Sequence, residues 1–158
     1  MKKRTILLVT SLLLLVCGCS LAKEEYSNDH FTITMEKGFT EKELASMTVY
    51  YESKKALMSG LKESFESLAA VDIDENTSIE DYGKAVIENN KANYELKEKD
   101  GVHYFTYEKE ASGKKFFYLA SVYKTDDAFW LFNFACDEKN KDTYEPLFLE
   151  WAKSVDFK

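Results

Sequence analysis

The sequence predicts an α+β fold in which an antiparallel β-sheet of about six to seven strands is flanked by helices. Apolar and polar residues alternate in consecutive runs between residues 94 and 136, and turn signals separate these runs. Two other segments, 78–89 and 142–154, carry apolar residues at helical spacing. The chain is 45% hydrophobic and 15% aromatic, which is enough for one domain to bury a sizeable core without disulfides.

The first strands are expected between residues 31 and 65. Phe31, Ile33 and Met35 alternate with threonines, and this run stops at Lys37 and Gly38. A second strand is predicted around 47–53, where β-formers are frequent, and a third at 56–65. A glycine within a strand often marks a bulge, so Gly60 is expected to form one.

A helix is predicted from Ser78 onward, because the apolar period changes there. Ile79, Tyr82, Val86 and Asn89 fall on one helical stripe. Ser78 is a favourable N-cap, and the acidic residues at 80 and 81 suit the positive end of the helix dipole.

A four-stranded meander is predicted from Tyr94 to Cys136. Its strands are 94–99, 102–110, 115–124 and 128–136, joined by turns at residues 100–101, 112–113 and 126–127. The last two strands are apolar on both faces: Phe117 and Phe116 point in opposite directions, as do Phe129 and Trp130. They are therefore expected to be central strands that are covered on both sides.

A last helix is expected at 142–154 as part of that cover. Its apolar stripe consists of Tyr144, Leu147, Phe148 and Trp151, at i, i+3, i+4 and i+7. Asp142 and Glu145 have the spacing of a capping box. Residues 155–157 are predicted to add an edge strand.

The N-terminus resembles a bacterial lipoprotein signal. Lys2, Lys3 and Arg4 precede an apolar segment from 6 to 16, which is too short to span a bilayer. Gly18 then supplies the small residue before Cys19, so residues 1–18 are expected to be removed and Cys19 to be lipidated, with Cys17 leaving in the signal. Two or three acyl chains anchor a protein stably, whereas one chain does so only marginally. An ordinary secretory signal cut near Ala22 is the alternative.

Three segments follow from this interpretation. Residues 1–18 are the removed signal, 19–30 are the lipidated N-terminus with a polar tether, and 31–158 are a single domain. A tether of about eleven residues reaches roughly 35 Å at most, at about 3.3 Å per residue. The expected location is the extracytoplasmic side of a cell membrane, lipid-anchored.

The mature region is strongly acidic and contains no arginine. The whole chain has 21 Lys plus Arg and 28 Asp plus Glu; removal of Lys2, Lys3 and Arg4 leaves 18 lysines against 28 acids, a net charge of −10. Bidentate recognition of phosphate favours arginine, and nucleic-acid binding needs a basic face. We therefore expect no nucleic-acid partner and no electrostatic contact with anionic lipid beyond the acyl chains.

Cysteine and histidine offer few catalytic candidates. After processing, Cys136 is the one free thiol, so no intrachain disulfide can form, and its place on the face of Trp130 and Phe134 predicts a packing role. His103 shares a strand face with Phe105 and is interpreted as structural, whereas His30 is expected to be exposed. No pair of carboxylates has a spacing that singles out acid and base roles.

The segment from Asp72 to Ser78 has part of the pattern of a calcium loop. Asp72, Asp74, Asn76 and Ser78 fall at positions 1, 3, 5 and 7. Position six lacks its glycine and position twelve lacks its glutamate, because these places hold Thr77 and Gly83. A solvated loop that caps the following helix is the preferred interpretation, and we predict no metal and no cofactor.

Tyrosines supply a possible contact surface, since their rings are amphipathic. Core packing is expected for most of them, and an interface or an apolar ligand groove for the rest. The tyrosines concerned are Tyr50, Tyr51, Tyr104, Tyr107, Tyr118 and Tyr123.

The order of elements resembles the PsbP-like fold group, including the DcrB-type bacterial lipoproteins. The resemblance covers nearly the whole mature chain. It rests on the first strand at 31–39, the mid-chain helix, the meander that ends at 129–136 and the helix that leads to 154–157. It implies an antiparallel sheet sandwiched by helices, and known members chiefly bind proteins. No functional residue carries over by position, and function from fold is analogy.

The sequence thus predicts a membrane-anchored envelope lipoprotein that is not an enzyme. It is expected to act as a binding or accessory module for an envelope protein or complex. The alternative is a small-ligand-binding or enzymatic lipoprotein with its site near His103 or the Asp72–Ser78 loop. A purely structural envelope component is a third possibility, and the oligomeric state is open.

Overall fold

The computed structural model describes residues 22–158, so Cys19 and the signal lie outside the described residues. Within this range a seven-stranded antiparallel sheet has the order β3-β4-β5-β9-β8-β7-β6, and a separate three-stranded sheet has the order β1-β2-β10. The fold is therefore α+β, as predicted. None of the helices between residues 22 and 158 is long and apolar enough to cross a membrane.

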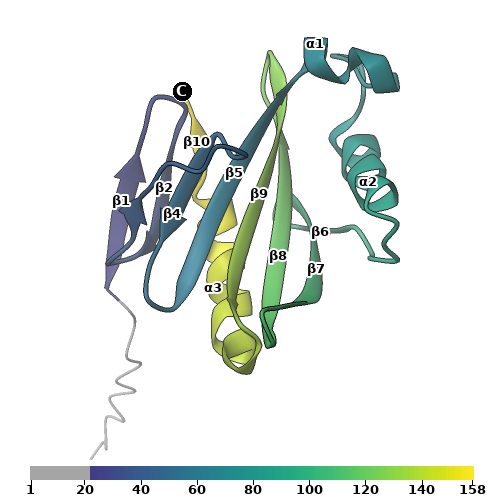
Figure 1. Cartoon of the computed structure of the whole chain (residues 1–158). Coiled ribbons are helices and arrows are strands. Elements are labelled where there is room, and N and C mark those ends of the chain that lie inside the picture. The colour runs from purple at the N-terminus through teal and green to yellow at the C-terminus, as the bar shows by residue number, and fades with distance from the viewer. Residues whose placement is uncertain (1–21) are drawn as a thin grey trace, which may run out of the picture.

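Figure 1 shows how the strands and helices are arranged. The strands are β1 (Lys23–Ser27), β2 (Phe31–Glu36), β3 (Thr40–Glu41), β4 (Val49–Glu52), β5 (Ala56–Ser64), β6 (Lys97–Lys99), β7 (Val102–Ala111), β8 (Lys114–Lys124), β9 (Ala128–Asp137) and β10 (Asp156–Phe157). The helices are α1 (Phe65–Leu68), α2 (Ile79–Asn89) and α3 (Lys141–Lys153), with the 3-10 turns η1 (Ala69–Val71) and η2 (Glu138–Asn140).

The main core lies between the seven-stranded sheet on one side and α3 with the small sheet on the other. Trp130, Phe132 and Phe134 of β9 meet Phe148 and Trp151 of α3 there, each at most 2% exposed. The predicted stripe of α3 is thus the buried face of the helix. Cys136 is buried in the same core, as its alternation predicted.

The helix α2 covers the opposite face of the sheet, so the architecture has three layers (Figure 1). Ser78 is its N-cap, with the side chain accepting a hydrogen bond from the amide of Asp81, as predicted. Tyr82 and Ile87 are buried, whereas Asn89 is exposed and does not continue the predicted apolar stripe. The strands β8 and β9 are covered on both faces, which confirms their central position.

Residues 23–27, inside the expected tether of residues 19–30, form the strand β1, which corrects that expectation for the described part of the segment. β1 pairs antiparallel with β2 over five residues, from Lys23 opposite Glu36 to Ser27 opposite Thr32. Its side chains are mostly exposed, so the pairing depends on the backbone and on Tyr26. The Tyr26 hydroxyl accepts hydrogen bonds from the amides of Gly38 and Phe39, both at 3.0 Å.

Three local predictions also need correction. Gly60 forms no bulge, because β5 and β9 pair in unbroken register; a Cβ there would lie 3.0 Å from the Phe132 ring, so close packing explains the glycine. Asp142 and Glu145 form no capping box, since η2 runs directly into α3 and Asn140 is the N-cap, without a side-chain hydrogen bond. The strand predicted at 94–99 is reduced to β6, because pairing with β7 is limited to 97–99; the Tyr94 ring stacks on Tyr107 instead.

Candidate functional site

The face of the large sheet that carries α2 is only partly covered by it. Two hollows flank the C-terminal half of this helix, and they share Val86, Asn90 and Leu131 in their linings. We call the two hollows together the α2 groove. Because Leu131 belongs to the central strand β9, the floor of the groove is the middle of the sheet.

The first hollow has a volume of about 520 Å³ and is mainly apolar. Leu61 and Leu131 form its floor, and Leu68, Val71 and Ile73 form its outer wall. Val71 is 62% exposed, the most exposed large apolar side chain in the described range. Hydrophobic surface of this kind, next to a hollow, is typical of a binding site.

Two carboxylates, Glu63 and Glu88, and no lysine stand among the described residues that line this first hollow. The Glu63 carboxylate accepts a hydrogen bond from the Tyr82 hydroxyl at 2.5 Å. Burial, and then the bond to Glu63, raises the pKa of Tyr82 far above its usual value, so the phenol stays neutral and remains a donor. The hollow is thus apolar with a negative edge.

Tyr82 fixes the position of α2 over the sheet. Its ring stacks on Phe129 of β9, with 4.2 Å between centroids and an interplanar angle of 8°. Gly83 lets the helix approach closely, since a Cβ there would lie 3.0 Å from Leu96 and 3.4 Å from Val122. These contacts define the height of the groove wall above the sheet.

The second hollow has a volume of about 400 Å³ and an aromatic border. Tyr107 lies at the centre of a stack, with its ring 5.2 Å from Tyr94 and 4.7 Å from Tyr118. Its hydroxyl donates to Asn133 Oδ1 at 3.0 Å. Burial raises the pKa of Tyr107, so this ring also presents a neutral polar edge to the groove.

The predicted tyrosines divide between the two faces of the sheet. Tyr51 and Tyr104 belong to the main core, and the Tyr123 hydroxyl donates to the carbonyl of Ala152 in α3 at 2.8 Å. Tyr107 lines the groove, and Tyr118 stacks beside it. Tyr50 is half-buried, on the opposite face of β4 from Tyr51. Most of these tyrosines therefore pack, as expected, and an interface or ligand groove formed by the rest stays a prediction.

His103 lines neither hollow of the groove. It is half-buried, and its Nδ1 is buried without a hydrogen-bond partner among residues 22–158. Glu98 lies opposite it across β6 and β7, but this carboxylate accepts from the Gly101 amide at 2.8 Å. His30 is also half-buried, with its ring 5.3 Å from Trp130, and is not the exposed residue that we expected.

The Asp72–Ser78 loop uses its polar groups on itself and on β8, where the Lys124 ammonium donates to the carbonyls of Glu75 and Thr77. Asp74 accepts hydrogen bonds from the amides of Asn76 and Thr77, and the first of these is the main reason why the pKa of Asp74 is lowered. In the described part of the chain no group of three or more His, Cys, Asp or Glu residues could hold a metal ion. The contribution of this loop to the groove is the apolar side chain of Ile73.

Cys136 has the properties of a packing residue. It is 2% exposed. Burial, and next the charge of Asp137, raises the pKa of its thiol to about 11, so almost no thiolate is present at neutral pH. This agrees with the packing role that the sequence predicted.

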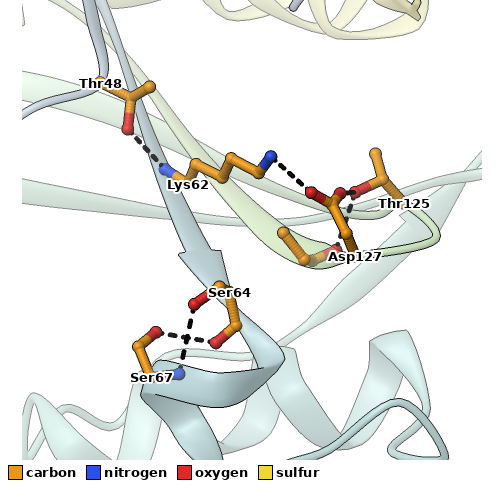
Figure 2. A network of polar contacts seen from close by, with 7 residues as sticks. Thr48, Lys62, Ser64, Ser67, Thr125 and Asp127 are labelled. Carbon is orange, nitrogen blue, oxygen red and sulfur yellow. Dashed lines mark hydrogen bonds and ion pairs between the residues drawn. The ribbon is translucent and has the colours of Figure 1, made fainter.

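A polar network holds the end of the sheet next to the groove (Figure 2). The Lys62 ammonium lies 2.6 Å from Asp127 in the β8–β9 turn, and the Lys62 amide donates to Thr48 at 2.9 Å. Ser64 caps α1 by accepting from the Ser67 amide. The network joins β5 to the β8–β9 turn and to the segment before β4, and so positions α1 and the wall that follows it.

Comparison with known proteins yields structural likeness only. No protein-family model matches the chain, and no curated protein matches it by sequence. The solution structure of the cyanobacterial PsbP (CyanoP) of Synechocystis sp. PCC 6803 is similar, with a TM-score of 0.55, 19% identity, and coverage of 89% of this chain and 96% of that one. A crystal structure from Bacteroides thetaiotaomicron VPI-5482 has a TM-score of 0.53 at 10% identity, covering 81% of this chain and 45% of that one.

These likenesses at low identity establish the fold. The seven-stranded antiparallel sheet, the α3 side and the α2 side together form a PsbP-like fold, as the order of elements in the sequence suggested.

Proposed function

We propose that this protein is a lipid-anchored cell-envelope lipoprotein of the DcrB type, and that it acts as a non-catalytic binding or accessory module. The binding surface is the α2 groove. The observation that carries the proposal is the apolar surface left open beside α2, above all the exposed Val71 at the edge of a 520 Å³ hollow. An apolar hollow of this size with a few polar groups at its edge is the usual form of a binding site.

The lining of the groove determines the chemistry of the partner. Leu61, Leu131 and Val86 accept apolar side chains, and the edge formed by Glu63 and Glu88 favours a positive charge. The partner is therefore an envelope protein that presents an apolar segment with a lysine or arginine beside it.

Site-specific photo-crosslinking in intact cells tests this proposal. A photoreactive residue in place of Val71 is expected to give a discrete protein adduct. The same residue in place of Thr143, which is exposed on α3 and lines neither hollow of the groove, is the matched control and is expected to give none. Val86→Glu should remove the adduct. Equal adducts from both positions, or an adduct unchanged by Val86→Glu, would contradict the choice of surface.

The anchor is tested separately by metabolic labelling with a palmitate analogue. Cys19→Ala is expected to abolish the label and to leave an unprocessed precursor, since only a cysteine offers the sulfur for thioether formation. Cys136→Ser is the control and should keep the label, because that thiol is buried. A label that persists in Cys19→Ala would refute lipidation at this residue.

The volume of the groove favours a second candidate function, the binding of a small apolar ligand. Ligand pockets commonly enclose about 300–1,000 Å³, and the first hollow lies in this range at about 520 Å³. Native mass spectrometry of protein extracted from its own membrane would detect a retained ligand as an added mass. Loss of that mass in Val86→Glu would assign the ligand to the groove.

A further inference from the structure

The chain enters the fold at one end of the large sheet, and three turns meet there. The carbonyl of Ala22 accepts a hydrogen bond from the Lys37 amide at 2.7 Å. Ala22, Lys37, Lys54 and Lys55 line one hollow, which joins the β2–β3 and β4–β5 turns. Lys54, Lys55 and Lys114 line a neighbouring hollow, which joins the β4–β5 turn to the β7–β8 turn. Figure 1 shows these turns at the end of the fold where β1 begins, at the bottom of the view.

Four lysines at this end lack a compensating charge. Lys37, Lys54, Lys55 and Lys114 are exposed, and none has a carboxylate within 4.0 Å among residues 22–158. We call these four residues the lysine end.

The carboxylates in the same two hollows are already engaged. Glu36 is 8% exposed and accepts from the Tyr144 hydroxyl at 2.9 Å. Glu52 is paired with Lys42, and Asp137 with Lys139. The lysine end is thus a positive surface on a domain that is acidic as a whole.

The turns at the opposite end of the sheet carry aspartates instead. Asp127 and Asp126 occupy the β8–β9 turn, and Asp72 and Asp74 follow η1. Asp127 is paired with Lys62, and the other three aspartates add negative charge far from the point at which the chain enters the fold.

The length of chain before Ala22 places the lysine end next to the membrane, if Cys19 carries the acyl chains. Two residues, Ser20 and Leu21, separate Cys19 from Ala22, and the three steps of the chain span at most about 11 Å. At physiological ionic strength the Debye length is about 8 Å, and a linker of this reach allows the lysines to come within that distance of an anionic lipid surface, where they respond to its potential.

We propose that the lysine end docks on anionic lipid headgroups and so orients the domain on the membrane. The inference rests on the proposed lipidation of Cys19. It replaces the expectation, drawn from net charge alone, that the domain avoids anionic lipid. A lysine near such a surface strengthens binding roughly fivefold, from about 1 kcal/mol per residue.

The test uses the full-length protein, lipidated in its host and reconstituted into vesicles of phosphatidylcholine with or without phosphatidylglycerol. A maleimide fluorophore is attached to Ala111→Cys, an exposed position opposite Lys114 across β7 and β8. Ala70→Cys, exposed in η1 at the other end, is the matched control. The buried Cys136 thiol stays unlabelled.

Protection from an aqueous quencher is the readout. We expect protection at position 111 in anionic vesicles, its loss in high salt, and no protection at position 70. The triple variant Lys54→Gln, Lys55→Gln, Lys114→Gln should lower the docking equilibrium constant about a hundredfold, as three fivefold losses. The variant Lys91→Gln, Lys97→Gln, Lys99→Gln removes the same charge elsewhere and should leave protection unchanged.

The outcomes separate this inference from the proposed function. Equal protection at position 111 in neutral and anionic vesicles overturns docking, and so does protection that survives the first triple variant. With the acyl label present, either result leaves the lipoprotein proposal intact. Absence of the acyl label on the wild-type chain overturns both.

Discussion

Replacing Tyr82 by Phe should loosen the wall of the α2 groove without changing its shape. The variant keeps the ring that stacks on Phe129 at 4.2 Å, but it loses the hydroxyl that donates to Glu63 at 2.5 Å. Hydrogen bonds to charged groups contribute about 1.5–3 kcal/mol. Because Glu63 is half-buried and water can replace the donor, we expect the lower value, about 1.5 kcal/mol.

The assay is urea unfolding followed by circular dichroism, together with hydrogen exchange of the amides in α2. Tyr94→Phe is the control, since Tyr94 is 38% exposed, and it should change the free energy of unfolding by less than about 0.5 kcal/mol. Glu63→Ala, which removes the acceptor, completes a double-mutant cycle, in which the two substitutions should be non-additive. Equal effects of Tyr82→Phe and Tyr94→Phe, or additivity in the cycle, would refute the anchoring of α2 through this bond.

Three further outcomes are expected. Gly60→Ala should lower the free energy of unfolding by about 1–3 kcal/mol in urea, because its Cβ would lie 3.0 Å from the buried Phe132 ring; a neutral effect would show that the ring can move freely. Cys136 should resist maleimide at pH 7 and react only on unfolding, since burial raises its pKa to about 11; fast native labelling would contradict its burial. Stability should fall above pH 10, because burial raises the pKa values of Tyr82 and Tyr144. Below pH 10 these two tyrosines contribute their full stabilisation of the fold. Above pH 10 they ionise in the unfolded chain but not in the folded one, so the free energy of unfolding falls by about 1.4 kcal/mol per tyrosine and pH unit. An alkaline titration of unfolding that stays flat to pH 12 would contradict this.

The strands of the meander could be predicted because their side chains alternate between the two buried faces of the sheet. Phe117 and Phe129 lie in different cores on opposite faces of one sheet, and alternation alone separates them. The helix α2 could be placed in the same way, from Ser78 and Tyr82. In these segments local pattern and tertiary burial agree, which is why the sequence sufficed.

β1 could not be predicted, because it is held by its backbone rather than by an apolar face. Four of its five side chains are exposed, so its composition is that of a polar linker. Only its partner β2 makes it a strand, and pairing between segments leaves no local signal. The division into two sheets could not be predicted for the same reason. The small sheet includes β10 near the C-terminus, and the pairing of β10 with β2 at Phe31 leaves no local signal in the sequence.

The α2 groove could not be predicted from the sequence, for a different reason. Leu61, Leu131 and Val86 belong to two strands and a helix, and each has an ordinary position in its own element. They become a surface only because α2 is narrower than the sheet and leaves part of the face open. The lysine end is a similar case, because net charge is a sum over the chain, whereas the position of charge depends on which turns meet at one end of the sheet.

The proposed lysine end and the proposed α2 groove together limit how far from the membrane a partner can bind. The lysine end lies at the start of β5, near Ala56, whereas the outer wall of the groove, with Leu68 and Val71, follows the end of that strand at Ser64. Nine residues of β-strand span about 30 Å. A domain docked on the lysine end therefore holds the outer wall of the first hollow about 30 Å from the headgroups. The second hollow lies nearer to them, because Lys109 in its lining pairs with Phe116, two residues from Lys114. Short apolar segments in the membrane interface could not reach the outer wall, so a partner that contacts Val71 must project its binding segment well beyond the lipid surface.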